Sequence, residues 1–446
     1  MNVFFKKSAV RVGLLTLAFA ALSITPALAE LELVSIPKSG AVKARGGGNG
    51  NGFSFSSTSD GLYTAFISNG SDLDPTAYDI AFTDIFVRNN ETGDIQKISK
   101  GGPNGQATNN STQVDIAAYG HHVAYTSYAT DIYADRDGDG VVDADQNGSL
   151  TDIFLYNIDT DTTKYVSVQD NGSQNNRDST MPSVSGNGQY VAFQSLKMHS
   201  SDPDITWEDI LVRDTVNGTT KFLSRVPGSG HCRLPDISTN GQFVTFSCVA
   251  RNSVNDDDYV NVTNINDNFE HIYVYDLVND TLELVSISGS GAVSDNNSSY
   301  PVISDSGRYV AFNSDATNLD LADDTGVTGI YIRDRALGTT TKVVAAGFIP
   351  SMSDDGRYVT ALGGAADHRI YNTQTGEGVD ILSDCNDCQS TIDASYFINA
   401  EITADGNKVL LNTLYSWDSN IDDNSAYDLY YYEICGEMEC LVPVCE

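Results

Sequence analysis

The stretch Asp135–Asp143 reads DRDGDGVVD and has aspartates at three successive alternate positions, followed by a glycine. Calcium takes about six to eight oxygen ligands, and alternating aspartates place their carboxylates on one side of a tight turn. Gly140 permits that turn. The pattern predicts a structural Ca²⁺ site that stiffens this loop. We expect its ligands to be the side chains or backbone carbonyls of Asp135, Asp137, Asp139, Val141 and Asp143.

This loop resembles the calcium loops of EF-hand, dockerin and integrin-α-propeller proteins, which share the D-x-D-x-D-G spacing. It departs from the full EF-hand at the twelfth position, where Gln146 replaces the bidentate glutamate. The resemblance therefore implies a weaker site, or ligation from Asp145 instead. No helices are expected beside the loop, so only the loop is shared. The alternative is an Asp/Gly turn that binds no ion.

Seven cysteines all lie in the second half of the chain, and disulfides are the default in an exported protein. A hairpin folded about Asn240-Gly241 places Cys232 nearly opposite Cys248, which predicts a disulfide between them. Cys385 and Cys388 are expected to close a small structural loop. Their acidic neighbours would raise the thiol pKa values, which disfavours a redox role.

The cysteine count is odd, so one thiol is expected to be free or intermolecular. The pairing of the C-terminal cysteines stays open at this point, and a zinc site shared with Cys385 and Cys388 is the minor alternative. These C-terminal residues are Cys435, Cys440 and Cys445.

Catalysis would require convergent side chains. If His199, His231, His271 and Arg233 met near one axis, they could serve a polysaccharide lyase or hydrolase. His122 stands at a strand position that is aromatic elsewhere, which favours packing in the core. No G-x-S-x-G, H-E-x-x-H or phosphate-loop motif occurs in the chain. We therefore assign no catalytic residue from the sequence.

Around these residues the chain repeats one pattern seven times, a short glycine turn followed by an alternating apolar strand. The alternation has the period of two that strands need, and glycine supplies the positive φ of a tight hairpin. A further strand follows each turn, such as DIFVR from Asp84 or DILVR from Asp209. The turn glycines are Gly61, Gly120, Gly188, Gly241, Gly307, Gly356 and Gly406.

Seven units of short strands without helical periodicity predict an all-β, seven-bladed β-propeller of four-stranded antiparallel blades over residues 30–434. A solenoid is the weaker alternative, because solenoids need capping repeats. The segment Leu31–Ile36 copies Leu282–Ile287, so we expect an N-terminal strand to complete the last blade and close the ring. Cys440–Val444 competes for that place, although Pro443 disfavours it away from a sheet edge.

The repeat S-D-S-G-R-Y-V-A-F from Ser304, followed by I-Y-I-R-D from Ile330, resembles the TolB-type, WD-repeat-like propeller repeats of exported bacterial proteins. The resemblance covers nearly the whole mature chain and implies the propeller fold. It does not imply an activity, since that fold hosts binders, lyases and hydrolases alike.

Residues 1–29 have a basic start, a short apolar run and the ending Ala27-Leu28-Ala29, which predicts a cleaved signal peptide. The product is expected in the periplasm or the medium, as a monomer without membrane insertion. A net charge of −35 disfavours nucleic acid and anionic membranes as partners. Residues 435–446 are expected to form a cysteine-containing tail.

Acidic loops recur between the second and third strands of the units, so one face of the propeller is expected to be acidic. A solvated surface of no further function is the alternative for most of these loops. Trp207 belongs to one of them and could contact a sugar or a peptide. The sequence predicts a non-catalytic binding scaffold for a protein or glycan, with a carbohydrate-active enzyme as the alternative. The loops include 71–79, 200–209, 255–268, 315–324 and 418–428.

Overall fold

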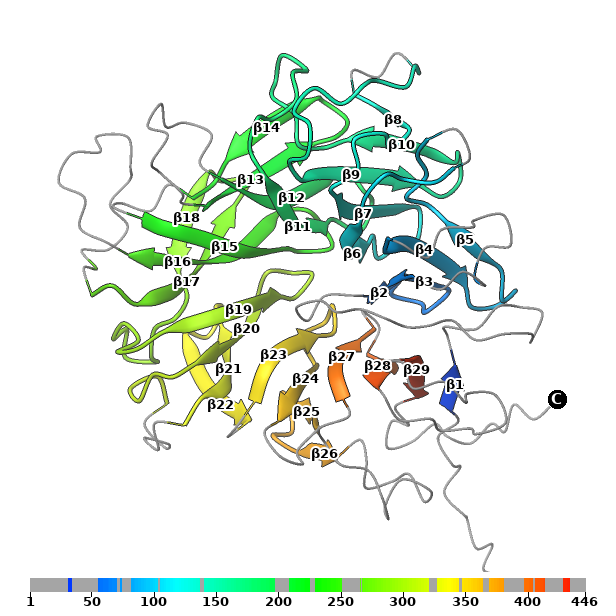
Figure 1. Cartoon of the computed structure of the whole chain (residues 1–446). Coiled ribbons are helices and arrows are strands. Elements are labelled where there is room, and N and C mark those ends of the chain that lie inside the picture. Colours follow the sequence, from blue (N-terminus) through cyan, green and yellow to red (C-terminus); the bar gives the residue numbers. More distant parts are fainter. Residues whose placement is uncertain are drawn as a thin grey trace, which may run out of the picture.

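A computed structural model of the whole chain gives the fold (Figure 1). Its described residues form strands and turns without any helix, as the sequence predicts for an all-β protein. In this part of the chain nothing helical has the length and hydrophobicity needed to cross a bilayer. The structure describes residues 31–33, 55–69, 73, 82–102, 105–136, 140–196, 208–224, 229–250, 265, 267–320, 327–344, 347–363, 369–380, 397–403, 406–413 and 428–433.

The described strands form seven sheets, six with four strands and one with five. Figure 1 shows the sheets succeeding one another in chain order around a common centre. The first strand of each sheet lies nearest that centre. These inner strands are β2 (Phe55–Ser57), β6 (Ser111–Ile116), β11 (Ser179–Val184), β15 (Ser229–Ile237), β19 (Ser298–Ile303), β23 (Gly347–Met352) and β27 (Phe397–Ile402).

Three further positions follow outward within each sheet, and consecutive strands pair antiparallel. The second strands are β3 (Tyr63–Ser68), β7 (His122–Ser127), β12 (Tyr190–Leu196), β16 (Phe243–Ala250), β20 (Tyr309–Ser314), β24 (Tyr358–Gly363) and β28 (Lys408–Thr413). The third strands are β4 (Asp84–Asn89), β9 (Asp152–Asn157), β13 (Glu208–Asp214), β17 (Glu270–Asp276), β21 (Gly329–Asp334), β25 (Arg369–Asn372) and β29 (Asp428–Glu433). The fourth strands are β5 (Ile95–Lys97), β10 (Thr162–Tyr165), β14 (Thr219–Phe222), β18 (Thr281–Leu284), β22 (Thr339–Val344) and β26 (Gly378–Asp380).

Two strands depart from this order. In the last sheet the fourth place belongs to β1 (Leu31–Leu33), which pairs antiparallel with β29 in the register Leu31 to Tyr432. The N-terminal strand thus joins the C-terminal strands, as the copied LELVSI segment predicts. In the sheet of β6, a fifth strand β8 (Ala134–Asp135) pairs in parallel with β10.

The turn glycines have φ between +68° and +82°, which is the left-handed conformation expected of them. They also lie against the preceding sheet. A Cβ added at Gly241 would come 2.8 Å from Cδ2 of Tyr190, and one at Gly61 would lie 3.6 Å from Cδ of Lys408 in the last sheet. The same contact therefore recurs between neighbouring sheets, including the last and the first.

The inner strands share a bulge that the sequence analysis did not predict. The ladder with the second strand shifts register at the same place in successive sheets, beside a residue with φ between 50° and 56°. A bulge leaves a residue outside the ladder, which is why proline is tolerated there. The left-handed residues are Gln113, Met181, Leu234, Tyr300 and Ile349, and all but the first precede a proline.

Some third strands begin with a buried aspartate whose carboxylate accepts hydrogen bonds from side chains that follow the fourth strand. Asp84 accepts a hydrogen bond from Ser99 Oγ at 2.7 Å and forms an ion pair with Lys97 at 2.7 Å. In the next sheet Asp152 accepts from Ser167 Oγ at 2.6 Å and from Gln174 Nε2 at 2.5 Å. Burial raises the pKa of Asp152 to about 7, because its partners are neutral.

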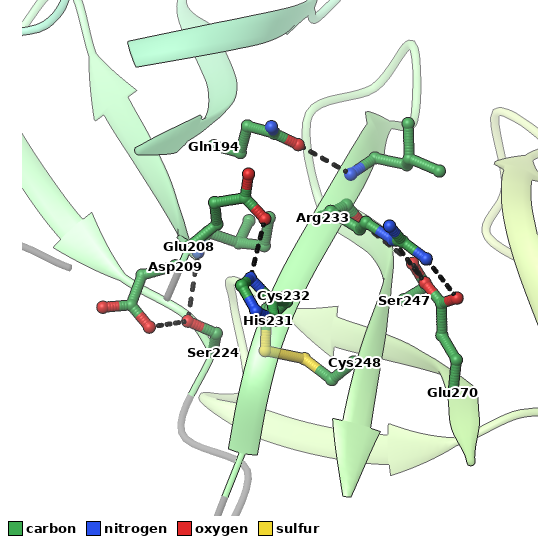
Figure 2. Close-up of a disulfide and its surroundings, with 12 residues drawn as sticks. Gln194, Glu208, Asp209, Ser224, His231, Cys232, Arg233, Ser247, Cys248 and Glu270 are labelled. Carbon is green, nitrogen blue, oxygen red and sulfur yellow. Dashed lines mark hydrogen bonds and ion pairs between the residues drawn. A yellow bond between two sulfur atoms is a disulfide. The ribbon is translucent and has the colours of Figure 1, made fainter. Parts of the chain in front are cut away.

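The predicted disulfide between Cys232 and Cys248 is confirmed (Figure 2). The two residues face one another in the β15–β16 ladder, and both are fully buried. A covalent link at this point fixes the bulged inner strand β15 against β16. It thereby anchors the segment that carries His231 and Arg233.

Candidate functional site

A cavity of about 250 Å³ lies where the inner strands of all seven sheets meet. We call it the axial cavity. Each sheet contributes three or four consecutive residues of its inner strand to the wall. The site is therefore assembled from segments that are far apart in the chain and is held by the rigid part of every sheet.

One layer of the wall contains a single residue from each sheet, and we call it the middle layer. Three of its members are acids and three are serines. In the order of the sheets the middle layer consists of Ser56, Asp115, Ser183, Asp236, Val302, Ser351 and Glu401.

Side-chain oxygens of the middle layer accept hydrogen bonds from backbone N–H groups of the next sheet. Asp115 accepts from the N–H of Val184 at 2.7 Å. The same contact links the last sheet to the first, where Glu401 accepts from the N–H of Ser57 at 3.3 Å. The layer thus ties neighbouring sheets together while it fixes the carboxyl groups in place. The other pairs are Ser183 with Ile237, Asp236 with Ile303, and Ser351 with Ile402.

The three acids of the middle layer hold protons more strongly than exposed acids do. Burial raises the pKa of Asp115 to about 6. Burial, together with the charges of Asp115 and Asp354, raises the pKa of Asp236 to about 7. Burial and the charges of Asp115 and Asp236 raise the pKa of Glu401 to about 8. Near neutral pH the cavity therefore changes its charge as these coupled groups titrate.

At the glycine-turn end, contacts run across the axial cavity. Thr239 Oγ1 donates to Asp354 Oδ1 at 2.7 Å, although these residues belong to turns two sheets apart. Thr239 also accepts from the N–H of Gly186 at 2.8 Å, and Asp354 accepts from that of Asp305 at 2.8 Å. These contacts join the turns at this end, so a ligand would enter from the opposite end, where the second strands end; we call it the loop end.

At the loop end the wall consists of the left-handed bulge residues, which we call the collar. Apart from Gln113, the collar is largely apolar. It places hydrocarbon and aromatic surface above the acidic middle layer. The remaining members are Met181, Leu234, Tyr300 and Ile349.

Arg233 precedes the collar residue Leu234 and does not belong to the lining of the cavity. Figure 2 shows its contact with Glu270. Its Nε and Nη2 donate to the buried carboxylate of Glu270 at 2.8 and 2.7 Å, and the side chain is 47% exposed. Ser247 Oγ donates to the same carboxylate at 2.6 Å. His231 contacts Glu208 at 3.3 Å. Glu270 therefore holds the guanidinium of Arg233 in a fixed orientation.

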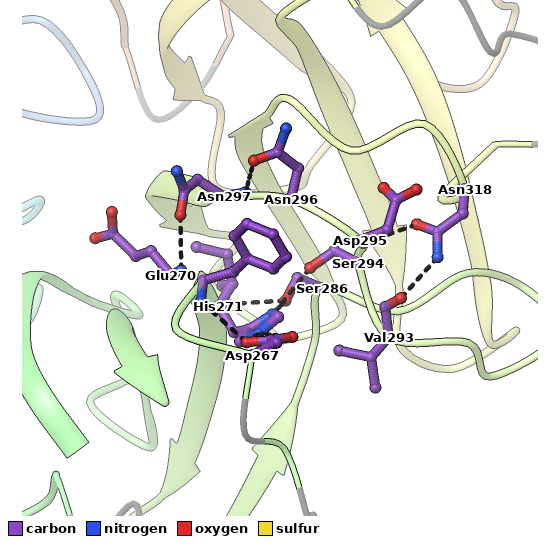
Figure 3. A network of polar contacts seen from close by, with 12 residues as sticks. Asp267, Glu270, His271, Ser286, Val293, Ser294, Asp295, Asn296, Asn297 and Asn318 are labelled. Atoms are coloured by element: carbon purple, nitrogen blue, oxygen red, sulfur yellow. Dashed lines mark hydrogen bonds and ion pairs between the residues drawn. The ribbon is translucent and has the colours of Figure 1, made fainter. Parts of the chain in front are cut away.

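His271 has a structural role (Figure 3). Its side chain is fully buried, with Nδ1 2.9 Å from Ser294 Oγ and Nε2 3.1 Å from both Asp267 oxygens. It takes the place that Asp84 and Asp152 occupy in other sheets. His231 and His271 have separate partners, and neither lines the axial cavity. The structure does not unite them in a catalytic cluster, and His199, His368 and Trp207 lie outside the described residues.

His122 packs between two neighbouring sheets, as its aromatic strand position predicts. It lies against the turn glycine Gly188 of the next sheet, at a position where five other sheets have tyrosine or phenylalanine and the last has Lys408. Its Nε2 is 3.0 Å from Asn157 Nδ2, and burial lowers its pKa.

The predicted calcium loop is described in part. The N–H of Gly140 donates to Asp135 Oδ2 at 2.9 Å, and the N–H of Arg136 donates to Asp143 Oδ2 at 2.8 Å. The guanidinium of Arg136 also pairs with Asp143 at 3.1 Å. Val141 is exposed. Asp137 and Asp139 lie outside the described residues, as do Cys385, Cys388, Cys435, Cys440 and Cys445.

The middle layer is the part of the site that sequence reasoning missed. A signal for it exists, because MPSVS, LPDIS, YPVIS and IPSMS each precede or overlap a glycine turn. The residue after the proline is the one that belongs to the middle layer. Asp115 and Glu401 have no such proline, but each of the three acids stands five residues before its turn glycine, so counting back from the turns would have placed Asp115, Asp236 and Glu401 at one position.

Comparison with solved structures identifies the fold class. An oligogalacturonate lyase from Vibrio parahaemolyticus superposes with a TM-score of 0.51 and 11% identity, over 92% of this chain and 98% of the lyase. An oligogalacturonate lyase in complex with manganese gives a TM-score of 0.52 and 9% identity, over 86% of this chain and 89% of the other. A putative TolB from Agrobacterium tumefaciens gives 0.37 and 15% identity, over 65% and 79%.

At these identities the likeness to the two lyases shows the fold alone, and the superposition on TolB is too loose to add to it. No protein-family model and no curated protein matches the sequence. The chain is thus an all-β protein with the propeller-type fold that the repeats predict, and its activity has to be argued from its own site.

Proposed function

We propose that this chain is an exported, non-catalytic binding propeller that holds a protein or glycan ligand at the loop end of its axial cavity. The observation that carries the proposal is the composition of the cavity wall. It presents carboxyl and hydroxyl acceptors fixed by backbone amides, and the described lining residues include no histidine, cysteine, lysine or arginine. Fixed acceptors favour binding, because little ordering is needed when the ligand arrives.

The scaffold we propose is a ring of seven blades closed by β1. Three contacts between the last and first sheets support closure: the hydrogen bond from Ser57 to Glu401, the packing of Gly61 on Lys408, and the shared core of Leu410 with Phe66. The fourth strand of the last sheet comes from the N-terminus, and such a covalent crossover resists opening of the ring.

A test of turnover distinguishes a binder from an enzyme. We expect no unsaturated product, measured by ultraviolet absorbance, when the mature protein is incubated with oligogalacturonate and Mn²⁺. We also expect no new reducing ends from a panel of neutral polysaccharides. Product formed by the wild type and abolished by Asp115→Asn with Asp236→Asn would contradict the proposal. A preparation of this double variant also controls for contaminating enzymes.

The second candidate is a carbohydrate-active enzyme, and the three cavity acids favour it. Glycoside hydrolysis uses a pair of carboxyl groups, one of which must stay protonated near neutral pH. The raised pKa values of Asp236 and Glu401 would suit such an acid. A uronate substrate, in contrast, would be repelled by the same charges. Under this candidate, neutral glycans in the panel are the substrates that should release reducing ends.

We further propose that the Asp135–Asp143 loop binds Ca²⁺ as a structural ion. Binding would require Asp143 to leave its ion pair with Arg136, which lowers the affinity. We expect calorimetry to show saturable binding with a raised melting temperature, both lost in Asp137→Ala with Asp139→Ala. Asp159→Asn, at an exposed turn, should bind like the wild type. Flat titration of the wild type would reduce the loop to a surface turn.

We also propose that the protein is exported from the cytoplasm. A signal peptide over residues 1–29 would place the mature chain in the periplasm or the medium as a monomer. Detection of a mature N-terminus at Glu30 in the exported fraction is the corresponding observation.

A further inference from the structure

Four carboxyl groups line the axial cavity without an opposite charge among its described lining residues. They belong to Asp115, Asp236, Asp354 and Glu401. Arg233 precedes the lining residue Leu234 but is itself outside the wall, where Glu270 neutralises it. Enclosing carboxylates without a counter-charge costs free energy, so the cavity favours binding of a cation over an anion or a neutral group.

A buried hydroxyl in the wall gives independent support for a ligand. Ser57 is 7% exposed, and within the described part of the chain its Oγ has no hydrogen-bond partner. It stands where other inner strands have isoleucine, valine or methionine, beside Glu401, which accepts from its backbone N–H. Unsatisfied buried polar groups are rare in folded proteins, and one that lines a cavity marks a place for an outside donor.

The geometry favours an organic cation over a metal ion. Among the described residues, no three His, Cys, Asp or Glu side chains are close enough to share one ion. Within the middle layer, one or two other residues separate each acid from the next. The acids therefore surround a space wider than the coordination sphere of one metal ion. A primary ammonium brings three donors, which matches a wall of carboxylate and hydroxyl oxygens.

The collar and the volume narrow the ligand further. Above the acids lie Met181, Leu234, Tyr300 and Ile349, which can contact an aliphatic stem. A volume of about 250 Å³ is below the roughly 300–1,000 Å³ of pockets for drug-sized ligands, so it suits a group the size of one side chain. Lysine has this construction, with a four-carbon stem and a compact ammonium head.

We infer that the axial cavity binds a primary alkylammonium, and that its natural source is a lysine side chain of a partner protein presented at the loop end. This inference rests on the proposed binding function and names its ligand. The stem contacts the collar, and the ammonium donates to the acids of the middle layer.

Calorimetric titration with three probes tests the inference. The probes are Nα-acetyl-lysine methylamide, its norleucine counterpart, which has the stem without the charge, and n-butylammonium, which has the ammonium without a peptide. We expect the lysine compound to bind more tightly than butylammonium, and norleucine to bind at least about tenfold more weakly than lysine. Tighter binding of butylammonium would instead identify a free amine as the ligand and overturn the partner-protein source.

Isosteric variants locate the site. Asp115→Asn, Asp236→Asn and Glu401→Gln together keep an oxygen for each backbone donor but remove the charges. We expect this triple variant to lose at least about tenfold in affinity for the lysine compound. Glu91→Gln, Asp159→Asn and Glu377→Gln replace the same number of acids at exposed positions and should bind as the wild type does. If the first triple variant does not fold, Asp115→Asn alone serves.

Two results would overturn the inference: equal binding of lysine and norleucine, or no binding of the lysine compound by folded wild type. In either case the turnover assay decides separately whether a binding propeller remains the right class. Absence of turnover with failed lysine binding leaves a binder of another ligand. Turnover itself would contradict the proposed function whatever the lysine result.

Discussion

Raising the pH from 5 to 8 should lower the free energy of unfolding by about 4 kcal/mol. Asp115, Asp236 and Glu401 have pKa values of about 6, 7 and 8 in the fold, above those of exposed acids. The folded state therefore binds these protons more strongly than the unfolded chain. Their stabilising contribution is complete below about pH 4 and is lost as the pH rises through the folded pKa values.

The magnitude follows from the number of groups. One pKa unit corresponds to about 1.4 kcal/mol, and each group is raised by two units or more. The three side chains are only half-buried, and solvent in the cavity screens their charges, so the expected total effect is about 4 kcal/mol. Denaturant unfolding at pH 5, 6, 7 and 8 measures the trend. A stability that is constant or increases over this range would contradict it.

The triple amide variant of the middle layer is the control for this trend. Each amide still accepts from the next sheet but no longer titrates, so most of the decrease with pH should disappear. A smaller decrease should persist, because Asp152 also has a pKa of about 7. The stability of the exposed variant at Glu91, Asp159 and Glu377 should decrease with pH as that of the wild type does, because its three cavity acids still titrate. Equal pH dependence in the two variants would disprove a special role of the cavity.

Replacing Lys97 with methionine should cost about 3–5 kcal/mol of unfolding free energy at pH 7. Lys97 is 2% exposed, and its Nζ lies 2.7 Å from a carboxylate oxygen of buried Asp84. Without it, Asp84 must either stay charged without its cation or take up a proton. Asp152, in the same place of the next sheet and without a cation, has a pKa of about 7. The loss should therefore be smaller at pH 5.

Lys100 provides the matched comparison, three residues along the chain. Its Nζ pairs with Asp161 at 2.6 Å, but Lys100 is only half-buried and Asp161 is exposed to solvent. Lys100→Met should cost less than about 1 kcal/mol, as exposed ion pairs do. Denaturant titration of both variants measures the difference. Equal costs would show that the Lys97–Asp84 pair does not behave as a buried ion pair.

The sequence predicts those parts of the fold that local patterns determine. A glycine turn followed by an alternating strand defines a hairpin without outside information, and the seven turn glycines have the expected φ. The Cys232–Cys248 disulfide could be predicted because both residues belong to one hairpin, where counting from Asn240-Gly241 gives the register. The N-terminal strand could be placed because LELVSI is repeated.

The cavity could not be predicted in this way, because its residues share a layer only after seven sheets have packed around one centre. Asp115 and Glu401 are 286 positions apart, and nothing local in either strand indicates that they interact. Four repeats have a proline after the collar residue, but the sequence does not show that a bulge lies there. Only the bulge explains why the side chain after the proline lines the cavity. The hypothesis of a histidine cluster also depended on long-range packing that the sequence does not show. In the structure His231 contacts Glu208, whereas His271 contacts Ser294 and Asp267.

The most direct test of the account is a count of the protons released when the cavity takes its ligand. Binding of Nα-acetyl-lysine methylamide at pH 7 can be measured by calorimetry in buffers of different ionisation enthalpy. An ammonium beside carboxyl groups with raised pKa values should displace about one proton, and the triple amide variant should release none. Lysine binding by the wild type without proton release would show that the ligand lies elsewhere and would contradict the account.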